Sequence, residues 1–270
     1  MIELGRAYGR PIGRRSQSNG IAMAAQEFTL ISFPEAVKCL DLGSYFTDRV
    51  LRKYRSANEE IAGIEADPEL LAQFNDLNPQ WREGVRKRFP MRYVRYYAGD
   101  GNIPGDIDLD KLLYEDNVAG IVTDGDLVID GTVFNWEIDT KASFIAARRN
   151  LSCRNLVAGC ADIVVRHDAL IANGMVSSYN HGRLEIGGDA HAKYFIVDDH
   201  HTYVGRDVHG YGWQRTGHGE IDLPESDWID EIRLEFRSEF FEDNGDMRCS
   251  SGNVDLVQAL LAGRNILRRP

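Results

Sequence analysis

The chain has 270 residues, a formal net charge of −11 at pH 7, 43% hydrophobic residues and four cysteines. This length and apolar content allow one body with a sizeable core and flanking elements, and no apolar run approaches the ~20 residues of a membrane span. The cysteines form no Cys-x-x-Cys pair, which favours a reducing cytoplasm, and the net acidity argues against a nucleic-acid backbone as the partner.

The N-terminal part is expected to hold an arm followed by helices. Residues 1–26 are rich in glycine and arginine and have no apolar core of signal-peptide length, which predicts a disordered arm. Residues 27–117 are expected to form a helical region. Within it, an apolar stripe from Phe46 to Tyr54 follows a helical spacing and predicts one helix.

Two further helices are predicted from their start signals. Asp67-Pro68 and Asn78-Pro79 each place a capping side chain before a proline, which is typical of a helix start. Pro90 should end the second of them at or before Phe89, because a proline disfavours helical geometry in its predecessor. After this helix, residues 91–97 are rich in β formers and favour a strand.

Charge and turn signals mark the rest of this region. Residues 82–95 hold six bases and one acid, interleaved with aromatic side chains. This run is compatible with a nucleic-acid surface, but we favour inward-packed aromatics with arginines that are solvated or contact the acidic segment between Glu220 and Asp246. Residues 100–106 look like a turn-rich linker, and residues 110–114 like a short amphipathic stretch.

Residues 118–210 carry a repeat. An apolar strand-like run, an Asp or Asn, and a second apolar run recur five times, with the acid or amide at Asp126, Asn150, Asp168, Asp189 and Asp207. The spacings are 24, 18, 21 and 18 residues. A period near 20 with β-type alternation predicts a single-stranded right-handed parallel β-helix of about five coils, with three strands per coil and the acid or amide at a corner.

The alternation predicts which side chains point inward. Before the corner residue these are pairs such as Ile145/Ala147 and Ile163/Val165, and after it pairs such as Leu151/Cys153 and Ala169/Ile171. Side chains of a strand alternate between its faces, so equivalent positions should stack into one apolar column. The fold class is therefore mainly β, with the N-terminal helices and a C-terminal helix expected to cap the two ends of the solenoid.

Residues 211–270 are predicted to form an acidic segment and that C-terminal capping helix. Between Glu220 and Asp246 there are eleven acids and two bases. Asn253 should cap the helix, whose apolar stripe includes Leu256 and Leu260 and which Gly263 should end. We expect acids of this segment to contact a protein partner: Asp222, Glu225, Asp227, Asp230, Glu231, Glu235, Glu239, Glu242 and Asp243.

A polar edge of the solenoid holds the residues with most chemical potential. It comprises Tyr179, Asn180, His181, Asp198, Asp199, His200 and His201. Counted back from their corner residues, Asn180 and Asp198 are equivalent, as are His181 and Asp199, so they should stack on adjacent coils about 4.8 Å apart. Such a stack could bind a metal or serve as acid and base. We favour a structural edge, because compact signatures such as His-Glu-x-x-His are absent.

No catalytic residues, metal site or cofactor are therefore assigned from the sequence.

His191 and His209 also occupy equivalent positions, each two residues after a corner residue and on the outward side. Phosphate-binding glycine-rich loops, the Gly-x-Ser-x-Gly motif and a strict six-residue period are likewise absent.

Several phrases of the chain resemble a known group. They are Asn150-Leu-Ser-Cys-Arg-Asn-Leu-Val-Ala-Gly159, Asp168-Ala-Leu-Ile-Ala172, Tyr179-Asn-His-Gly182, Gly187-Gly-Asp189, Asp198-Asp-His-His201 and Ala262-Gly-Arg264. They look like bacterial β-helix proteins labelled polymer-forming or cytoskeletal-like, whose coils are similar to those of bactofilins. Some of these lie beside polymorphic-toxin genes, which implies an immunity role.

The sequence leaves three functions open. The first is a cytoplasmic, non-enzymatic binding protein, an immunity protein that occludes a basic toxin domain, with the acidic segment steering association. The second is a bactofilin-like scaffold that self-associates through solenoid ends, although the long flanks argue against this. The third is an enzyme built on His181 and Asp199.

Overall fold

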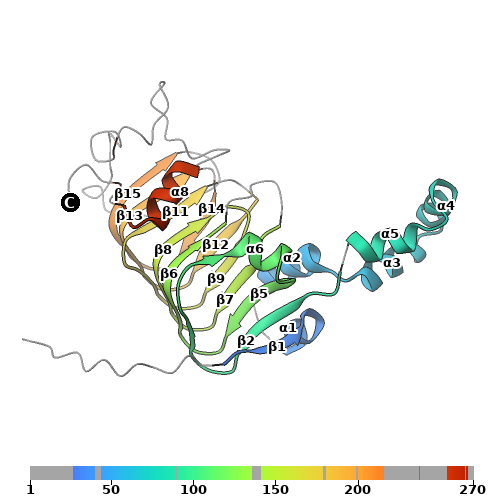
Figure 1. The fold of residues 1–270 in the computed structure, drawn as a ribbon, viewed down its shortest axis with the longest axis horizontal. Coiled ribbons are helices and arrows are strands. Elements are labelled where there is room, and N and C mark those ends of the chain that lie inside the picture. The colour runs from blue at the N-terminus through green and yellow to red at the C-terminus, as the bar shows by residue number, and fades with distance from the viewer. Residues whose placement is uncertain are drawn as a thin grey trace, which may run out of the picture.

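A computed structural model describes residues 27–39, 44–88, 90–135, 141–178, 181–198, 200–215, 237, 254–264 and 266. Its body is a parallel β-solenoid in which two sheets run side by side along the stack of coils (Figure 1). We number the coils one to six by the strand that begins each of them in the first sheet: β2, β5, β7, β9, β12 and β14. The predicted fold class is confirmed.

The first sheet has seven strands, all parallel except the first. In spatial order they are β1 (Thr29–Ser32), β2 (Tyr93–Tyr97), β5 (Val118–Thr123), β7 (Phe144–Ala147), β9 (Asp162–Val165), β12 (Arg183–Ile186) and β14 (His201–Val204). β1 pairs antiparallel with β2 and so occupies the edge at which the solenoid begins. The strand predicted for residues 91–97 is therefore part of the solenoid.

The second sheet contains the other passes of each coil. Its strands are β3 (Gly101–Ile103), β4 (Ile107–Asp108), β6 (Leu127–Phe134), β8 (Leu151–Ala158), β10 (Ala169–Ile171), β11 (Gly174–Ser178), β13 (Ala190–Asp198) and β15 (Val208–Arg215). The second and third strands of a coil are separate in coil one, as β3 and β4, and in coil four, as β10 and β11. In coils two, three, five and six they form one long strand, with an irregularity in the pairing of β6 with β8 and of β13 with β15.

The core is the predicted apolar column. Ile121, Ile145, Ile163 and Leu184 lie in register on successive strands of the first sheet and are fully buried. Leu127, Leu151, Ala169 and Ala190 do the same in the second sheet. A single coil could not bury its own apolar side chains. Each coil therefore stacks on the one before it, and the inward side chains of neighbouring coils bury one another.

The corner residues form a hydrogen-bonded ladder. In each step the side-chain Oδ1 of one corner residue accepts the backbone N–H of the next, at 2.8, 3.2, 3.0, 2.9 and 3.2 Å. The members are Asp100, Asp126, Asn150, Asp168, Asp189 and Asp207. The Asp or Asn that recurs in the sequence is therefore the residue that forms this ladder in each coil.

The solenoid begins earlier than the sequence predicted. β3 lies inside the supposed linker 100–106, and Asp100 is a sixth corner residue. Coil one was missed because helix α6 (Leu109–Tyr114), capped by the side chain of Asp108, is inserted between β4 and β5. Its corner residue consequently stands 26 residues from the next one.

Two helices cover the outer face of the first sheet. α1 (Phe33–Cys39) and α2 (Ser44–Tyr54) bury Phe33, Phe46 and Val50 against side chains of β7 and β9. The predicted helix at Phe46 to Tyr54 is confirmed, but its predicted place as an end cap is wrong. The first edge is covered by β1, because an antiparallel strand satisfies the backbone groups of β2 that would otherwise be unpaired.

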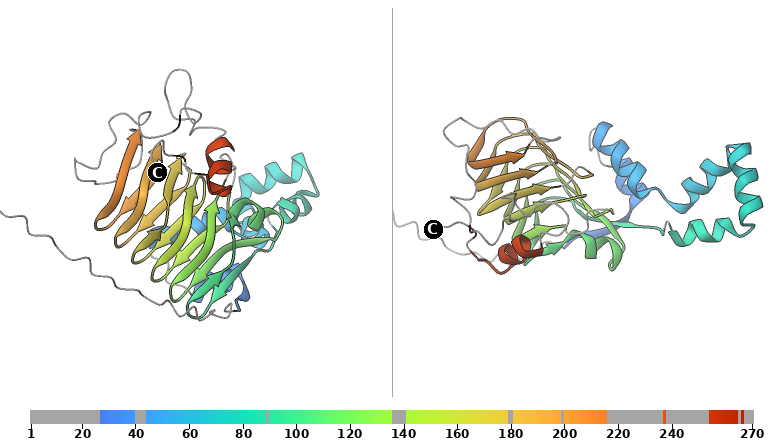
Figure 2. Two further views of the ribbon diagram at one scale, coloured as in Figure 1. Left: turned by 60° about the vertical axis from the view of Figure 1, so that its left-hand side comes forward. Right: turned by 90° about the horizontal axis from the view of Figure 1, so that it is seen from above.

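Three further helices form an arm that extends away from the solenoid (Figure 2). They are α3 (Ala57–Glu65), α4 (Pro68–Leu77) and α5 (Trp81–Arg88), packed around a small cluster that includes Ile61, Ile64 and Trp81. The predicted start at Asp67 is confirmed, because Asp67 Oδ1 accepts the N–H groups of Glu69 and Leu70. The next helix, α5, begins at Trp81 and not at the predicted first residue, Pro79. α5 ends at Arg88, as the proline at position 90 requires.

The C-terminal helix α8 (Val254–Leu261) packs beside the solenoid near β6 and β8, and Gly263 follows it with a φ of 66°. Its stop was predicted correctly, but it lies against the side of early coils and not over the last one. Position 253, expected to cap it, lies outside the described residues. No helix in the described part of the chain is long and apolar enough to cross a membrane.

Candidate functional site

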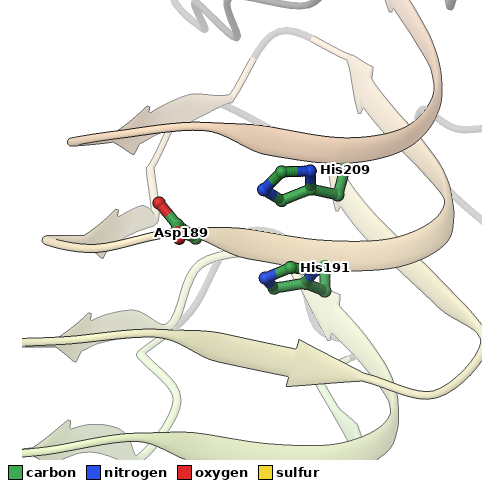
Figure 3. A group of neighbouring side chains, drawn as sticks. All are labelled: Asp189, His191 and His209. Atoms are coloured by element: carbon green, nitrogen blue, oxygen red, sulfur yellow. The ribbon is translucent and has the colours of Figure 1, made fainter.

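The last two coils bring three metal-ligating side chains together on the outer surface. Asp189, His191 and His209 each offer a ligand atom, and these atoms all lie within 4.8 Å of one another. The two imidazole rings are stacked, with centroids 4.3 Å apart and planes inclined by 13° (Figure 3). His209 is exposed and the other two are half-buried.

Sheet register explains this meeting. Ala190 pairs with Val208 and His191 with His209 on the parallel strands β13 and β15, so the histidines are direct neighbours. The inward Ala190 holds the backbone in the core, and the alternation of the strand sends the next side chain outward. The equivalence predicted from the sequence is confirmed, although no metal chemistry was assigned to the pair.

The two histidines end a row that is otherwise nonionic. Along the second sheet, the outward positions in register are Asn102, Val128, Ser152, Leu170, His191 and His209. Only coils five and six therefore place imidazoles in this row. The spacing alone could have located the pair, but the carboxylate of Asp189 joins it because the corner lies two residues before His191.

One cation lies beside this group. Arg206 Nη2 is 2.6 Å from Asp168 Oδ1, and its Nε is 3.5 Å from Asp189 Oδ1. The backbone N–H of Asp189, and after it the charge of Arg206, lowers the pKa of Asp168. Asp189 Oδ1 is engaged by the ladder and by this guanidinium.

The predicted stacking of the polar edge is partly wrong. Asp198 pairs with Ser178, and not with Asn180. The reason is loop length: four residues connect β11 to β12, whereas two connect β13 to β14, so counting back from the corners loses the register. Tyr179, Asn180 and Asp199 lie outside the described residues, and the catalytic role considered for His181 with Asp199 stays a prediction.

Within this edge, His200 is a structural residue. It is fully buried, and its Nε2 lies 3.1 Å from the carbonyl oxygen of Gly159 while Nδ1 lies 2.9 Å from Thr202 Oγ1. A carbonyl only accepts, so Nε2 carries the proton and Nδ1 accepts from the hydroxyl. Burial lowers the pKa of His200 to about 3, so the ring is neutral at physiological pH. By contrast, His181 is exposed and His201 is half-buried.

An ion-pair cluster fastens α2 to the solenoid near this edge. Asp162 is fully buried and lies 2.9 Å from Arg49 Nη2 and 2.6 Å from Lys53 Nζ. Lys53 also donates to the carbonyl of Cys160 at 2.8 Å, and Arg49 to that of His181 at 3.0 Å. No sequence signal pointed to this cluster beyond two bases one helical turn apart, because their acid is more than 100 residues away.

Two arginines of the basic run 82–95 are paired with acids. Arg82 Nη2 lies 2.8 Å from Glu65 Oε1, and Arg95 Nη2 lies 3.1 Å from Asp116 Oδ2. Trp81 and Tyr97 are buried, as expected for inward-packed aromatics, whereas Tyr93 is 40% exposed and position 89 lies outside the described residues. The partners of these two arginines are acids of neighbouring elements within the N-terminal half of the chain.

The acidic residues predicted to contact a partner lie outside the described residues, from position 222 to position 243. Both neighbours of this segment in the chain are placed, however. It follows β15, which ends at Arg215 on the last coil, and precedes α8, whose Leu256, Ala259 and Leu260 are fully buried. Near its middle, the N–H of Arg237 donates to the carbonyl of Ile266 at 3.0 Å.

A scan against protein-family models, a search of curated proteins and a search of solved structures each return no match. The solenoid is the part of the bactofilin resemblance that the structure bears out. Membership of a family with immunity or filament-forming members stays a prediction.

Proposed function

We propose that this chain is a non-enzymatic, cytoplasmic binding protein that recognises a basic protein surface with its acidic segment. In finer terms, we propose an immunity protein that occludes a toxin domain. The observation that carries the proposal is the attachment of the acidic segment to the solenoid at both ends, through β15 on coil six and through α8 beside β6.

Attachment matters because ordering a chain on binding costs entropy. A segment joined at both ends to placed elements, and again through Arg237 to Ile266, has less freedom to lose than a free tail of the same length. The filled core of the solenoid provides a stiff frame for these attachment points. Eleven acids against two bases between positions 220 and 246 give the segment a strongly negative field.

The charge indicates the class of partner. A dense negative segment accelerates encounter with a positively charged surface and disfavours acidic partners, because opposite potentials steer association. Nucleases and nucleotide-binding toxin domains present such basic surfaces to their substrates. Occlusion of that surface by the acidic segment would block the substrate directly.

The variant that tests this role neutralises three acids of the segment. Asp227→Asn, Asp230→Asn and Glu231→Gln together should weaken binding to the purified product of the neighbouring gene by at least about tenfold, mainly through a slower association rate. Kinetics of binding to the immobilised product measure both rate constants. Rescue of growth from that product's toxicity should fall in parallel.

A matched control removes three exposed acids elsewhere. Glu69→Gln, Asp76→Asn and Glu115→Gln remove the same number of negative charges as the test variant, but these residues lie on α4 and just after α6. They should change affinity by less than about twofold, because exposed charges beyond a Debye length are screened. Equal losses in both variants, or no binding and no rescue by the native chain, contradict the proposal.

The alternative function, self-association through solenoid ends, meets an obstacle at coil one. β1 lies antiparallel on β2 and occupies the edge that a head-to-tail neighbour would need. Within the described ranges, β14 and β15 at the other end lack a further strand. At coil one, β3 and β4 of the second sheet lack one too, so β1 blocks that end only at the first sheet. Analytical ultracentrifugation should therefore show no species larger than a tail-to-tail dimer across salt concentrations. Long polymers would instead favour the scaffold.

A further inference from the structure

We infer that Asp189, His191 and His209 bind one divalent transition-metal cation, of which Zn²⁺ is the natural probe. None of the three ligands belongs to the acidic segment, and the binding function proposed above does not depend on this site. All three ligands belong to the stretch from the corner of coil five to the second sheet of coil six (Figure 3).

The backbone already sets the separation of the ligands. Zinc takes nitrogen and oxygen donors at about 2.0–2.1 Å, so two donors of one tetrahedral ion lie about 3.4 Å apart. The donor atoms of this group lie within 4.8 Å of one another, so side-chain rotations alone can close the difference. His191 and His209 sit directly opposite each other on parallel strands, and no shift of register is needed.

Ring orientation defines the movement that the ion requires. Imidazole lone pairs lie in the ring plane, and with planes only 13° apart the lone pairs of the two rings lie in nearly parallel planes. A modest tilt of each ring toward the other makes the lone pairs converge. His209 is exposed and free to turn on its solvent side, so this tilt costs little free energy.

The donor set selects the kind of metal. Two imidazoles and one carboxylate suit zinc, copper and nickel, whereas Mg²⁺ and Ca²⁺ prefer all-oxygen sites. Three protein ligands leave a position for water on the exposed side of His209. Asp189 Oδ1 is held by the N–H of Asp207 and by Arg206, so Oδ2 would face the ion.

Neighbouring groups support and oppose the site. The ladder bond fixes the carboxyl group of Asp189 as an outer partner fixes a metal ligand. The charge of Arg206 opposes a cation, but its Nη2 is drawn to Asp168 at 2.6 Å. In the parts of the chain that the structure describes, the ring contact of His191 and His209 is with each other, which leaves their nitrogens available to an ion.

The test uses the full chain without an affinity tag, titrated with Zn²⁺ alone and followed by calorimetry. The native chain should bind one ion at this site. His209→Phe keeps the ring stack but removes the nitrogen donors, and it should abolish this binding. Asp189→Asn keeps a side-chain oxygen for the ladder, as Asn150 does naturally, and should weaken binding by at least the roughly tenfold that loss of an outer-shell partner causes.

A histidine outside the group provides the control. His167 is exposed at the corner of coil four, and His167→Phe should leave zinc binding unchanged. Co²⁺ gives a second readout, because a tetrahedral site with imidazole ligands yields a visible absorption band, which should vanish in His209→Phe. Thermal unfolding without metal should be alike in native chain and variant. No binding by the native chain, or equal binding by native chain and His209→Phe, overturns the inference.

Discussion

Asp162→Ala should lower the free energy of unfolding by about 3–5 kcal/mol, because the change leaves two partly buried cations without their acid. Arg49 and Lys53 both converge on this fully buried carboxylate, at 2.9 and 2.6 Å. The loss should centre on α2, whose polar face is fastened to the solenoid by this cluster. Denaturant titration measures the total, and hydrogen exchange should report earlier opening of α2.

An exposed ion pair serves as the control for Asp162. Glu65 lies 2.8 Å from Arg82 on the helical arm, and both side chains are well exposed. Glu65→Ala should therefore cost less than about 1 kcal/mol, because solvent screens such pairs. Combining Asp162→Ala with Lys53→Met should recover part of the loss, since it removes one unpaired charge. Similar small losses for Asp162→Ala and Glu65→Ala would show that the cluster does not hold α2.

Acid should destabilise the protein through His200. Burial lowers the pKa of this residue to about 3, against an ordinary value near 6.5. Between these values the unfolded chain binds a proton at this position and the folded chain does not, so stability falls as the pH drops from about 6.5 toward 3. The contribution is about 1.4 kcal/mol per pH unit at most.

Two variants isolate this contribution. His200→Gln keeps an N–H donor for the carbonyl of Gly159 but does not titrate, so the slope of stability against pH should decrease by up to one proton. His167→Gln, at an exposed position, should leave the slope as it is in the native chain. Unfolding curves from pH 4.5 to 7.5 measure the slopes. An unchanged slope in His200→Gln would contradict the neutral buried ring.

The fold could be predicted from the sequence because one residue, the corner acid or amide, recurs in each coil. A corner acid or amide accepts an N–H from the next coil, so such a residue recurs once per coil: Asp126, Asn150 and Asp168 are 24 and 18 residues apart. Inward side chains alternate around these corners and stay apolar, as Ile145 and Ile163 do. Both signals are local, and a solenoid repeats local structure.

What depends on insertions and on distant contacts could not be predicted. The insertion of α6 hid the corner at Asp100. Two extra residues in the loop before β12 broke the expected pairing of Asn180 with Asp198. The docking of α2 depends on Asp162, which no pattern in the helix reveals.

Two of the three residues of the candidate metal group could be placed together from the sequence. His191 and His209 could be placed side by side and outward because each follows a corner residue by two positions. The third member, Asp189, was already explained as a corner residue, so its second role was hidden. Only the coordinates show that the ladder leaves its carboxyl group beside the two rings (Figure 3).

The central claim is that an acidic segment held on a rigid solenoid recognises a basic protein. Its most direct test is the association rate constant with the purified product of the neighbouring gene, measured from about 0.05 to about 0.5 M salt. If charge steers the encounter, the rate constant should fall steeply as salt rises, while the triple variant at positions 227, 230 and 231 shows a shallower dependence. A rate constant that is independent of salt, with no difference between native chain and variant, would contradict the claim.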